Sequence, residues 1–133
     1  VISAIVRKRT ALDMTCFNSY RTKICTEINS FIDSFGKVAI WGAGHQALAI
    51  ITMADLSGKV EYVVDSAPFK QNKYTPATHL PIVSPEALTA NPVEAVIIMA
   101  ASYSDEVSDI LIKNFDQKIK VAILRDFGLE IIT

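Results

Sequence analysis

The stretch VAIWGAGHQALAI, Val38 to Ile50, decides the fold of this chain because it joins a strand, a glycine turn and a helix. Its first four residues are an apolar run of strand formers. The segment after the glycines is apolar almost all round, as a helix buried against a sheet should be. Between them, Gly42 to Ala47 fit the pattern GxGxxA. The first glycine of that pattern allows a tight turn, and the second lets a phosphate approach the backbone.

The rest of the chain continues this alternation of strands and helices. Four further apolar runs are predicted strands: Val60–Asp65, Leu80–Val83, Ala95–Ala100 and Lys120–Leu124. A serine-proline-glutamate start at Ser84 and capping-box spacing between Ser102 and Asp105 predict helices between the later strands. Continuous apolar runs are typical of parallel strands covered on both faces.

We therefore expect an α/β fold, a Rossmann-like doubly wound parallel sheet. Its five strands, numbered along the chain, should lie in the order 3-2-1-4-5. Val38–Trp41 is then central, with Ala95–Met99 beside it. Leu80–Val83 is expected at an outer edge because it contains a proline.

An amphipathic helix is predicted before the sheet. Apolar residues from Phe17 to Phe35 recur mostly at steps of three and four, and Gly36 is expected to end the helix as a left-handed cap. The sequence thus divides into an N-terminal helical segment, residues 1–35, and a Rossmann-like domain, residues 36–133. We expect the chain to be a fragment of a larger protein, since it starts with Val1.

Composition excludes several classes of function. The 133 residues carry 13 basic and 14 acidic side chains, which gives no electrostatic case for nucleic acid or an anionic membrane as a partner. No apolar run reaches the length of a membrane span. Cys16 and Cys25 match no metal or redox spacing, so we expect free thiols and a cytoplasmic protein.

The candidate ligand-binding residues gather around the glycine turn and the carboxyl ends of the predicted strands. Asp65 ends the second strand, where an acid can accept hydrogen bonds from a ribose. The long segment 65–82 adds a lysine and a histidine, and the fourth strand is followed by two polar residues. The full set is Gly42, Ala43, Gly44, His45, Gln46, Asp65, Lys70, His79, Ser102 and Tyr103.

Each of these residues also has a purely structural interpretation. The glycines could serve only as a packing corner, His79 as a hydrogen-bonded structural residue, and Lys70 as a solvated lysine. Ser102 could do no more than cap a helix. No nucleophile–base pair and no cluster with metal spacing is evident, so we expect neither a catalytic residue nor a metal site in this chain.

Three segments resemble one family. IWGAGHQALAI, YVVDSAPFKQNKYTPATHLPIVSPEAL and AASYSDEV resemble the C-terminal domain of the S-adenosylmethionine-dependent nucleotide-sugar C-methyltransferases. The densest match is in the long segment: Asp65, Pro68, Lys70, Gln71, Lys73, Tyr74, Thr75, Pro76, Thr78, His79 and Pro81.

The resemblance implies an accessory domain that helps to hold a nucleotide-linked deoxysugar and is inactive alone. It implies no cofactor in this chain and S-adenosylmethionine in the full-length enzyme. The expected partners are the nucleotide-sugar and a methyltransferase domain in the same full-length chain, with a homodimer left open. Two alternatives remain: an NAD(P)-type oxidoreductase or regulatory domain, and a structural or oligomerisation domain with a vestigial pocket.

Overall fold

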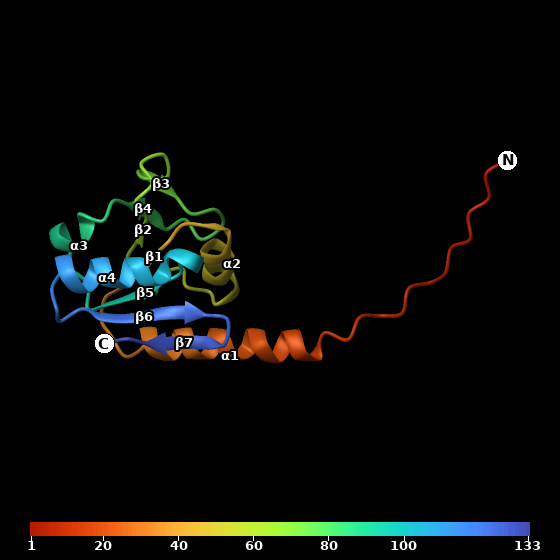
Figure 1. Ribbon diagram of the computed structural model, residues 1–133, viewed down its shortest axis with the longest axis horizontal. Helices are drawn as coiled ribbons and strands as arrows, with labels where there is room; N and C mark the ends of the chain where they lie inside the picture. Colours follow the sequence, from red (N-terminus) through yellow and green to blue (C-terminus); the bar gives the residue numbers. More distant parts are fainter.

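A computed structural model describes residues 1–133 as one seven-stranded sheet with helices on both faces (Figure 1). The mixed α/β class predicted from the sequence is confirmed. In chain order the elements are α1 (Thr15–Ile32), β1 (Val38–Trp41), α2 (His45–Met53), β2 (Val63–Val64), β3 (Lys73–Tyr74), β4 (Pro81–Val83), α3 (Ala87–Ala90), β5 (Ala95–Ile98), the 3-10 turn η1 (Ala101–Tyr103), α4 (Ser104–Asn114), β6 (Lys120–Arg125) and β7 (Gly128–Ile131).

The sheet has the order β3-β4-β2-β1-β5-β6-β7. The five inner strands are parallel, and β1 lies between β2 and β5. The chain leaves β1 through α2 toward one side of the sheet and leaves β5 through α4 toward the other. The two connections therefore diverge at the carboxyl ends of β1 and β5, where open α/β sheets bind their ligands.

The two edge strands differ from the sequence-based expectation. Leu80–Val83 was expected at the outer edge, but β3 pairs antiparallel outside β4. Pro81 is tolerated there because it is the first residue of its strand, and its neighbour Ile82 accepts the hydrogen bond from the Asn72 N–H at 2.9 Å. The segment 65–82 is thus partly a hairpin, not one irregular loop.

Strand β7 was not foreseen. It turns back antiparallel along β6 and forms the other edge of the sheet, with α1 alongside it (Figure 1). Two side chains of α1 hold it: the Glu27 carboxylate accepts from the Leu129 N–H at 2.8 Å, and the Lys23 ammonium donates to the Phe127 carbonyl at 2.6 Å. The strand depends on these distant partners.

The core has two layers, one on each face of the sheet. Alternate side chains of β1 divide between them: Val38 and Ile40 pack with α1 and α2, whereas Ala39 and Trp41 pack with α3 and α4. This alternation is the period-two geometry of a strand covered on both faces. Since α1 shares the first of these layers with the sheet, the division of the chain at residue 36 stays a prediction.

Only the second half of α1 is covered by the sheet. Ile24 and Ile28 are fully buried, but Phe17 and Tyr20 are 51% and 45% exposed, on the part of the helix that projects past β7 (Figure 1). The apolar stripe predicts that Phe17 packs on the sheet domain or on a second copy of the chain. The sheet does not cover Phe17, so the second arrangement stays a prediction. Residues 1–14 lead away from the sheet as an extended arm (Figure 1).

The end of α1 also differs from the expectation. The helix stops at Ile32, and Asp33 closes it in a right-handed conformation with its N–H donated to Asn29. Gly36 is not left-handed, so the predicted glycine cap is wrong. None of the helices has the length and apolar character that a membrane crossing requires.

Candidate functional site

A cavity of about 320 Å³ opens at the carboxyl ends of β1 and β5. It contains the whole glycine turn and the first residues after β2 and β5. Its lining residues are Trp41, Gly42, Ala43, Gly44, His45, Gln46, Asp65, Ser66, Lys70, Met99, Ala100, Ala101, Tyr103 and Val107. Its size lies at the lower end of the range for small-molecule sites.

Gly42 is required by the fold itself. Its φ is +123°, a conformation that side-chain-bearing residues rarely adopt. A Cβ atom there would collide with the carbonyl group of Met99, because β1 and β5 pair closely at this point. The first glycine of the motif is thus a packing corner, whatever the site binds.

Gly44 is different. Its φ of −89° and ψ of 175° suit any residue, and a Cβ atom built on it would meet nothing within 4 Å. Neither backbone conformation nor packing within the chain therefore requires a glycine here. The open space above Gly44 belongs to the cavity, so this position is free for the close approach of a ligand.

The start of α2 faces the same space. The helix begins at His45, and no side chain caps its first N–H groups. Uncapped N–H groups at a helix N-terminus carry a partial positive charge and favour anions. Both His45 and Gln46 line the cavity.

Asp65 already has partners within the chain. Its carboxylate accepts hydrogen bonds from the N–H of Ala43 at 2.8 Å, the N–H of Ala67 at 2.9 Å and the ammonium of Lys70 at 3.0 Å. Burial raises the pKa of Asp65, but these three donors outweigh it and leave the pKa below its usual value. Asp65 thus fixes the glycine turn to the segment after β2.

Lys70 lies at the edge of the cavity, paired with Asp65. Its side chain is 31% exposed. An ammonium has three donors, and one of them is used by Asp65. The other two can reach a ligand without breaking the internal pair.

His79 does not join the site. It lies between β3 and β4 with φ of +54° and stacks on Tyr74, with ring centroids 4.3 Å apart and planes 3° apart. Its backbone N–H donates to Thr75 at 3.0 Å. It is not among the cavity residues, and the structure gives it a place in the hairpin.

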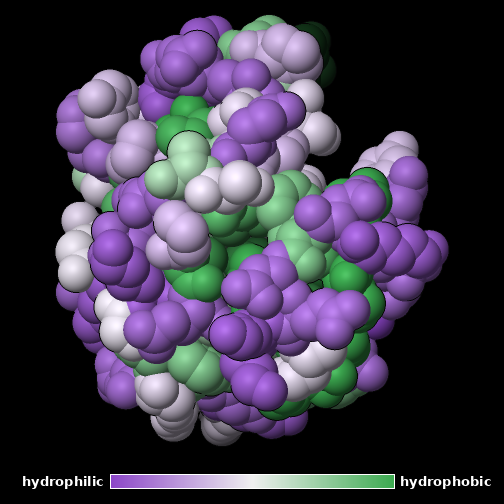
Figure 2. Space-filling view, turned by 90° about the vertical axis from the view of Figure 1, so that its left-hand side faces the viewer, coloured by the Kyte–Doolittle hydropathy of each residue, from purple (hydrophilic) through white to green (hydrophobic).

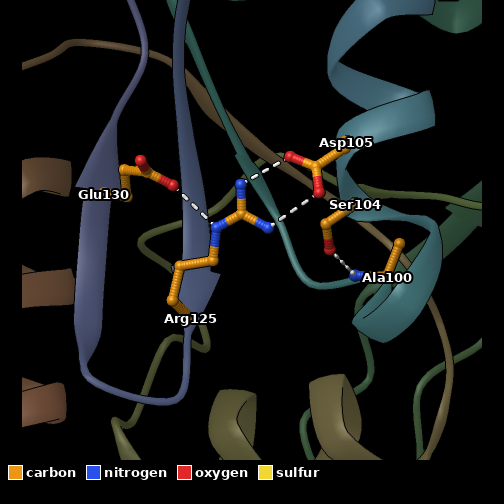
Figure 3. Close-up of polar contacts among 5 residues, drawn as sticks. All are labelled: Ala100, Ser104, Asp105, Arg125 and Glu130. Atoms are coloured by element: carbon orange, nitrogen blue, oxygen red, sulfur yellow. Dashed lines mark hydrogen bonds and ion pairs between the residues drawn. The ribbon is translucent and has the colours of Figure 1, made fainter.

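The residues after β5 are only partly as expected. Tyr103 lines the cavity, but Ser102 does not. The capping box of Ser102 and Asp105 does not form, because α4 starts at Ser104 without a side-chain cap. Ser104 instead accepts from the Ala100 N–H at 3.3 Å, and Asp105 binds Arg125 (Figure 3).

Arg125 holds this side of the site in place. Its guanidinium makes a two-pronged contact with Asp105 and donates from Nε to Glu130 at 2.7 Å (Figure 3). The hydrogen bonds that the guanidinium donates to the two carboxylates raise its own pKa, and those to Asp105 lower the pKa of that carboxyl. The network ties the start of α4 to β6 and β7 next to Tyr103.

Eight of the ten predicted residues thus meet in one cavity, and binding by them stays a prediction. Sequence reasoning missed six others: Trp41, Ser66, Met99, Ala100, Ala101 and Val107. Most of these could have been found by the rule that residues ending or following parallel strands line the crevice. Val107 could not, because its place depends on how α4 packs.

A larger cavity of about 690 Å³ lies at the opposite, amino ends of the strands, lined by residues such as Phe35, Leu88, Pro92 and Lys120. Figure 2 views this side of the molecule, where hydrophobic residues show between hydrophilic ones. The helices that connect parallel strands begin at the carboxyl ends of those strands, so none of their N-termini faces the larger cavity. The smaller cavity is therefore the better candidate site. No three metal-ligating side chains come together anywhere in the structure.

Comparisons with known proteins agree with this architecture. Residues 14–123 match the family described as the C-methyltransferase C-terminal domain. No curated protein matches the chain significantly. Among solved structures, UDP-D-quinovosamine 4-dehydrogenase from Vibrio fischeri is similar, with a TM-score of 0.54 and 15% identity over 73% of this chain and 93% of that one. At this identity the likeness concerns the fold alone.

Proposed function

Because this chain belongs to the family of C-methyltransferase C-terminal domains, we propose that it is the nucleotide-sugar-binding accessory domain of a sugar C-methyltransferase. In this proposal the domain binds the diphosphate of a nucleotide-linked deoxysugar and carries out no chemistry alone. A methyltransferase domain in the same full-length, cytoplasmic protein binds S-adenosylmethionine and transfers the methyl group.

One observation carries the proposal: the glycine at position 44 has no structural reason to be a glycine. The open space above it adjoins the uncapped N–H groups of α2. A diphosphate fits such a place, since it needs a close backbone approach, hydrogen-bond donors and positive potential. Lys70 adds two spare donors at the edge of the same cavity.

The engaged state of Asp65 favours this ligand over NAD(P). A dinucleotide of that kind uses the acid at the end of the second strand to hold a ribose. Here the Asp65 side chain is 11% exposed, and its carboxylate accepts from Ala43, Ala67 and Lys70. These internal bonds would compete with a ribose hydroxyl.

The uncovered half of α1 is the proposed contact with the methyltransferase domain. Phe17 and Tyr20 continue the apolar stripe of Ile24 and Ile28 beyond the sheet. An exposed aromatic stripe of this kind is typical of a surface that another domain covers. A second copy of the chain could cover the same stripe and is the competing arrangement.

Binding of nucleoside-diphosphate sugars to wild type and Gly44→Ala tests the function. The added methyl group has room in the fold, so stability should change by less than about 1 kcal/mol. It should displace the diphosphate from a backbone donor and weaken binding about 10- to 100-fold. Calorimetry measures the stability of each variant and its affinity for the ligand. The amide NMR shifts of His45 and Gln46 report whether the ligand binds at this turn.

A matched control adds the same methyl group elsewhere. Gly36→Ala lies at the amino end of β1, where the added atom meets only the flexible Glu94 carboxylate at 3.0 Å. It should bind like wild type. The proposal is wrong if no nucleotide-sugar binds wild type at millimolar concentration, if NAD binds better, or if Gly44→Ala binds as tightly as the control.

A further inference from the structure

The cavity over the glycine turn does not end at Tyr103. A second space of about 380 Å³ adjoins it, and the two share Trp41, Ser66, Tyr103 and Val107. We call this second space the apolar subsite. Its remaining lining residues are Pro85, Glu106, Ile110, Asn114 and Phe115.

The apolar subsite differs chemically from the phosphate end. Its walls come mainly from α4 and from the segments after β2 and β4, and Glu106 is its only charged residue. Apolar and aromatic side chains at the wall suit a flat, weakly hydrated group. A diphosphate would find no cation here and would be repelled by the Glu106 carboxylate.

Trp41 lines the subsite and carries a hydrogen-bond donor, its indole N–H. The residue is 4% exposed, and its ring lies edge-on to that of Phe115, with centroids 6.3 Å apart. The indole N–H has no hydrogen-bond partner in the chain. Every fully buried side-chain nitrogen or oxygen of this structure does have a partner, so the indole nitrogen is not one of the fully buried atoms. The indole N–H is therefore not fully enclosed, and Trp41 lines both this subsite and the cavity over the glycine turn. A buried indole N–H normally has an acceptor, so this one lacks a partner that a ligand can supply.

Tyr103 stands between the two spaces. Although it is a large aromatic residue, it is 67% exposed at the start of α4 and lines both cavities. The Arg125–Asp105 contact fixes the backbone turn that carries it (Figure 3). An exposed aromatic ring on a fixed turn is a surface on which a base can stack.

We propose that the apolar subsite binds the nucleobase of the nucleotide-sugar. The base packs against Tyr103, and one of its edge acceptors takes the hydrogen bond from the Trp41 indole N–H. The diphosphate then extends over Val107 and Ser66 toward Gly44 and Lys70. This inference rests on the proposed function and adds to it the place of the base and the residues that read it.

The chain supplies a direct probe, because Trp41 is its only tryptophan. Its indole N–H gives one NMR resonance, and its fluorescence reports on the wall that the two cavities share. Titration with uridine diphosphate should shift the indole resonance downfield and change the emission, whereas pyrophosphate should shift only the amides of His45 and Gln46.

Tyr103→Ala provides the mutational test, since its exposed side chain can be removed without opening the core. It should weaken uridine diphosphate binding about 10- to 100-fold and pyrophosphate binding much less, because the ring stacks on the base and carries no charge for the phosphates. Tyr20→Ala, which removes an exposed tyrosine of α1, should change neither.

The outcomes separate the two proposals. If uridine diphosphate moves the His45 and Gln46 amides but not the Trp41 indole, or if Tyr103→Ala binds it normally, the base lies elsewhere and the phosphate site stands. If Tyr103→Ala weakens both ligands equally, the residue supports the turn and does not stack on a base. If neither ligand binds wild type, the proposed function fails and this inference fails with it.

Discussion

Replacement of Asp65 with asparagine should destabilise the fold by about 2–4 kcal/mol at neutral pH. The carboxylate accepts from two backbone N–H groups, of Ala43 and Ala67, and pairs with Lys70. An asparagine retains one acceptor oxygen and turns an NH2 group toward a donor. At least one buried N–H then loses its partner, which costs about 1–3 kcal/mol, and the loss of the half-buried ion pair adds to it.

The effect should depend on pH in a defined direction. The folded-state pKa of Asp65 lies below the value near 3.9 of an unfolded chain. The carboxylate therefore contributes its full stabilisation above the unfolded pKa and loses it as the pH falls through the folded pKa. Wild type and Asp65→Asn should differ most above about pH 5, and the difference should shrink as the pH falls below the unfolded-chain pKa.

Urea denaturation followed by circular dichroism at a series of pH values measures this difference. Asp109→Asn is the matched control, because Asp109 pairs with Lys113 at 3.8 Å on the exposed face of α4. It should change stability by less than about 1 kcal/mol. A loss for Asp65→Asn no larger than for the control, or one that is equal at pH 3 and pH 7, would refute the assigned role of the carboxylate.

Two further predictions follow from the packing. Gly42→Ala should destabilise the fold by about 2–4 kcal/mol in urea denaturation, because it forces a Cβ into the Met99 carbonyl at positive φ; a loss as small as that of Gly44→Ala would contradict it. On α1, Ile28→Ala should cost about 2–5 kcal/mol and Phe17→Ser less than about 0.5 kcal/mol, since only the first is buried in this chain. Equal losses would show that Phe17 is covered.

The candidate site shows how far local sequence reasoning extends. The GxGxxA pattern predicted which turn lines the cavity, because it combines a strand end, a tight corner and a helix start within a few residues. It did not distinguish Gly42, which the strand pairing requires, from Gly44, which nothing in the chain requires. That distinction depends on Met99, which lies far along the sequence.

The sequence by itself determined the alternation of strands and helices, and it determined that the glycine turn lines the candidate site. Those features follow from side-chain periodicity and from residues that are neighbours in the chain. Tertiary structure alone decided the edge strands β3 and β7, the uncovered half of α1 and the partners of Asp65. It also placed Trp41 in the apolar subsite and His79 outside the site. Each depends on contacts between residues far apart in sequence, which no local pattern specifies.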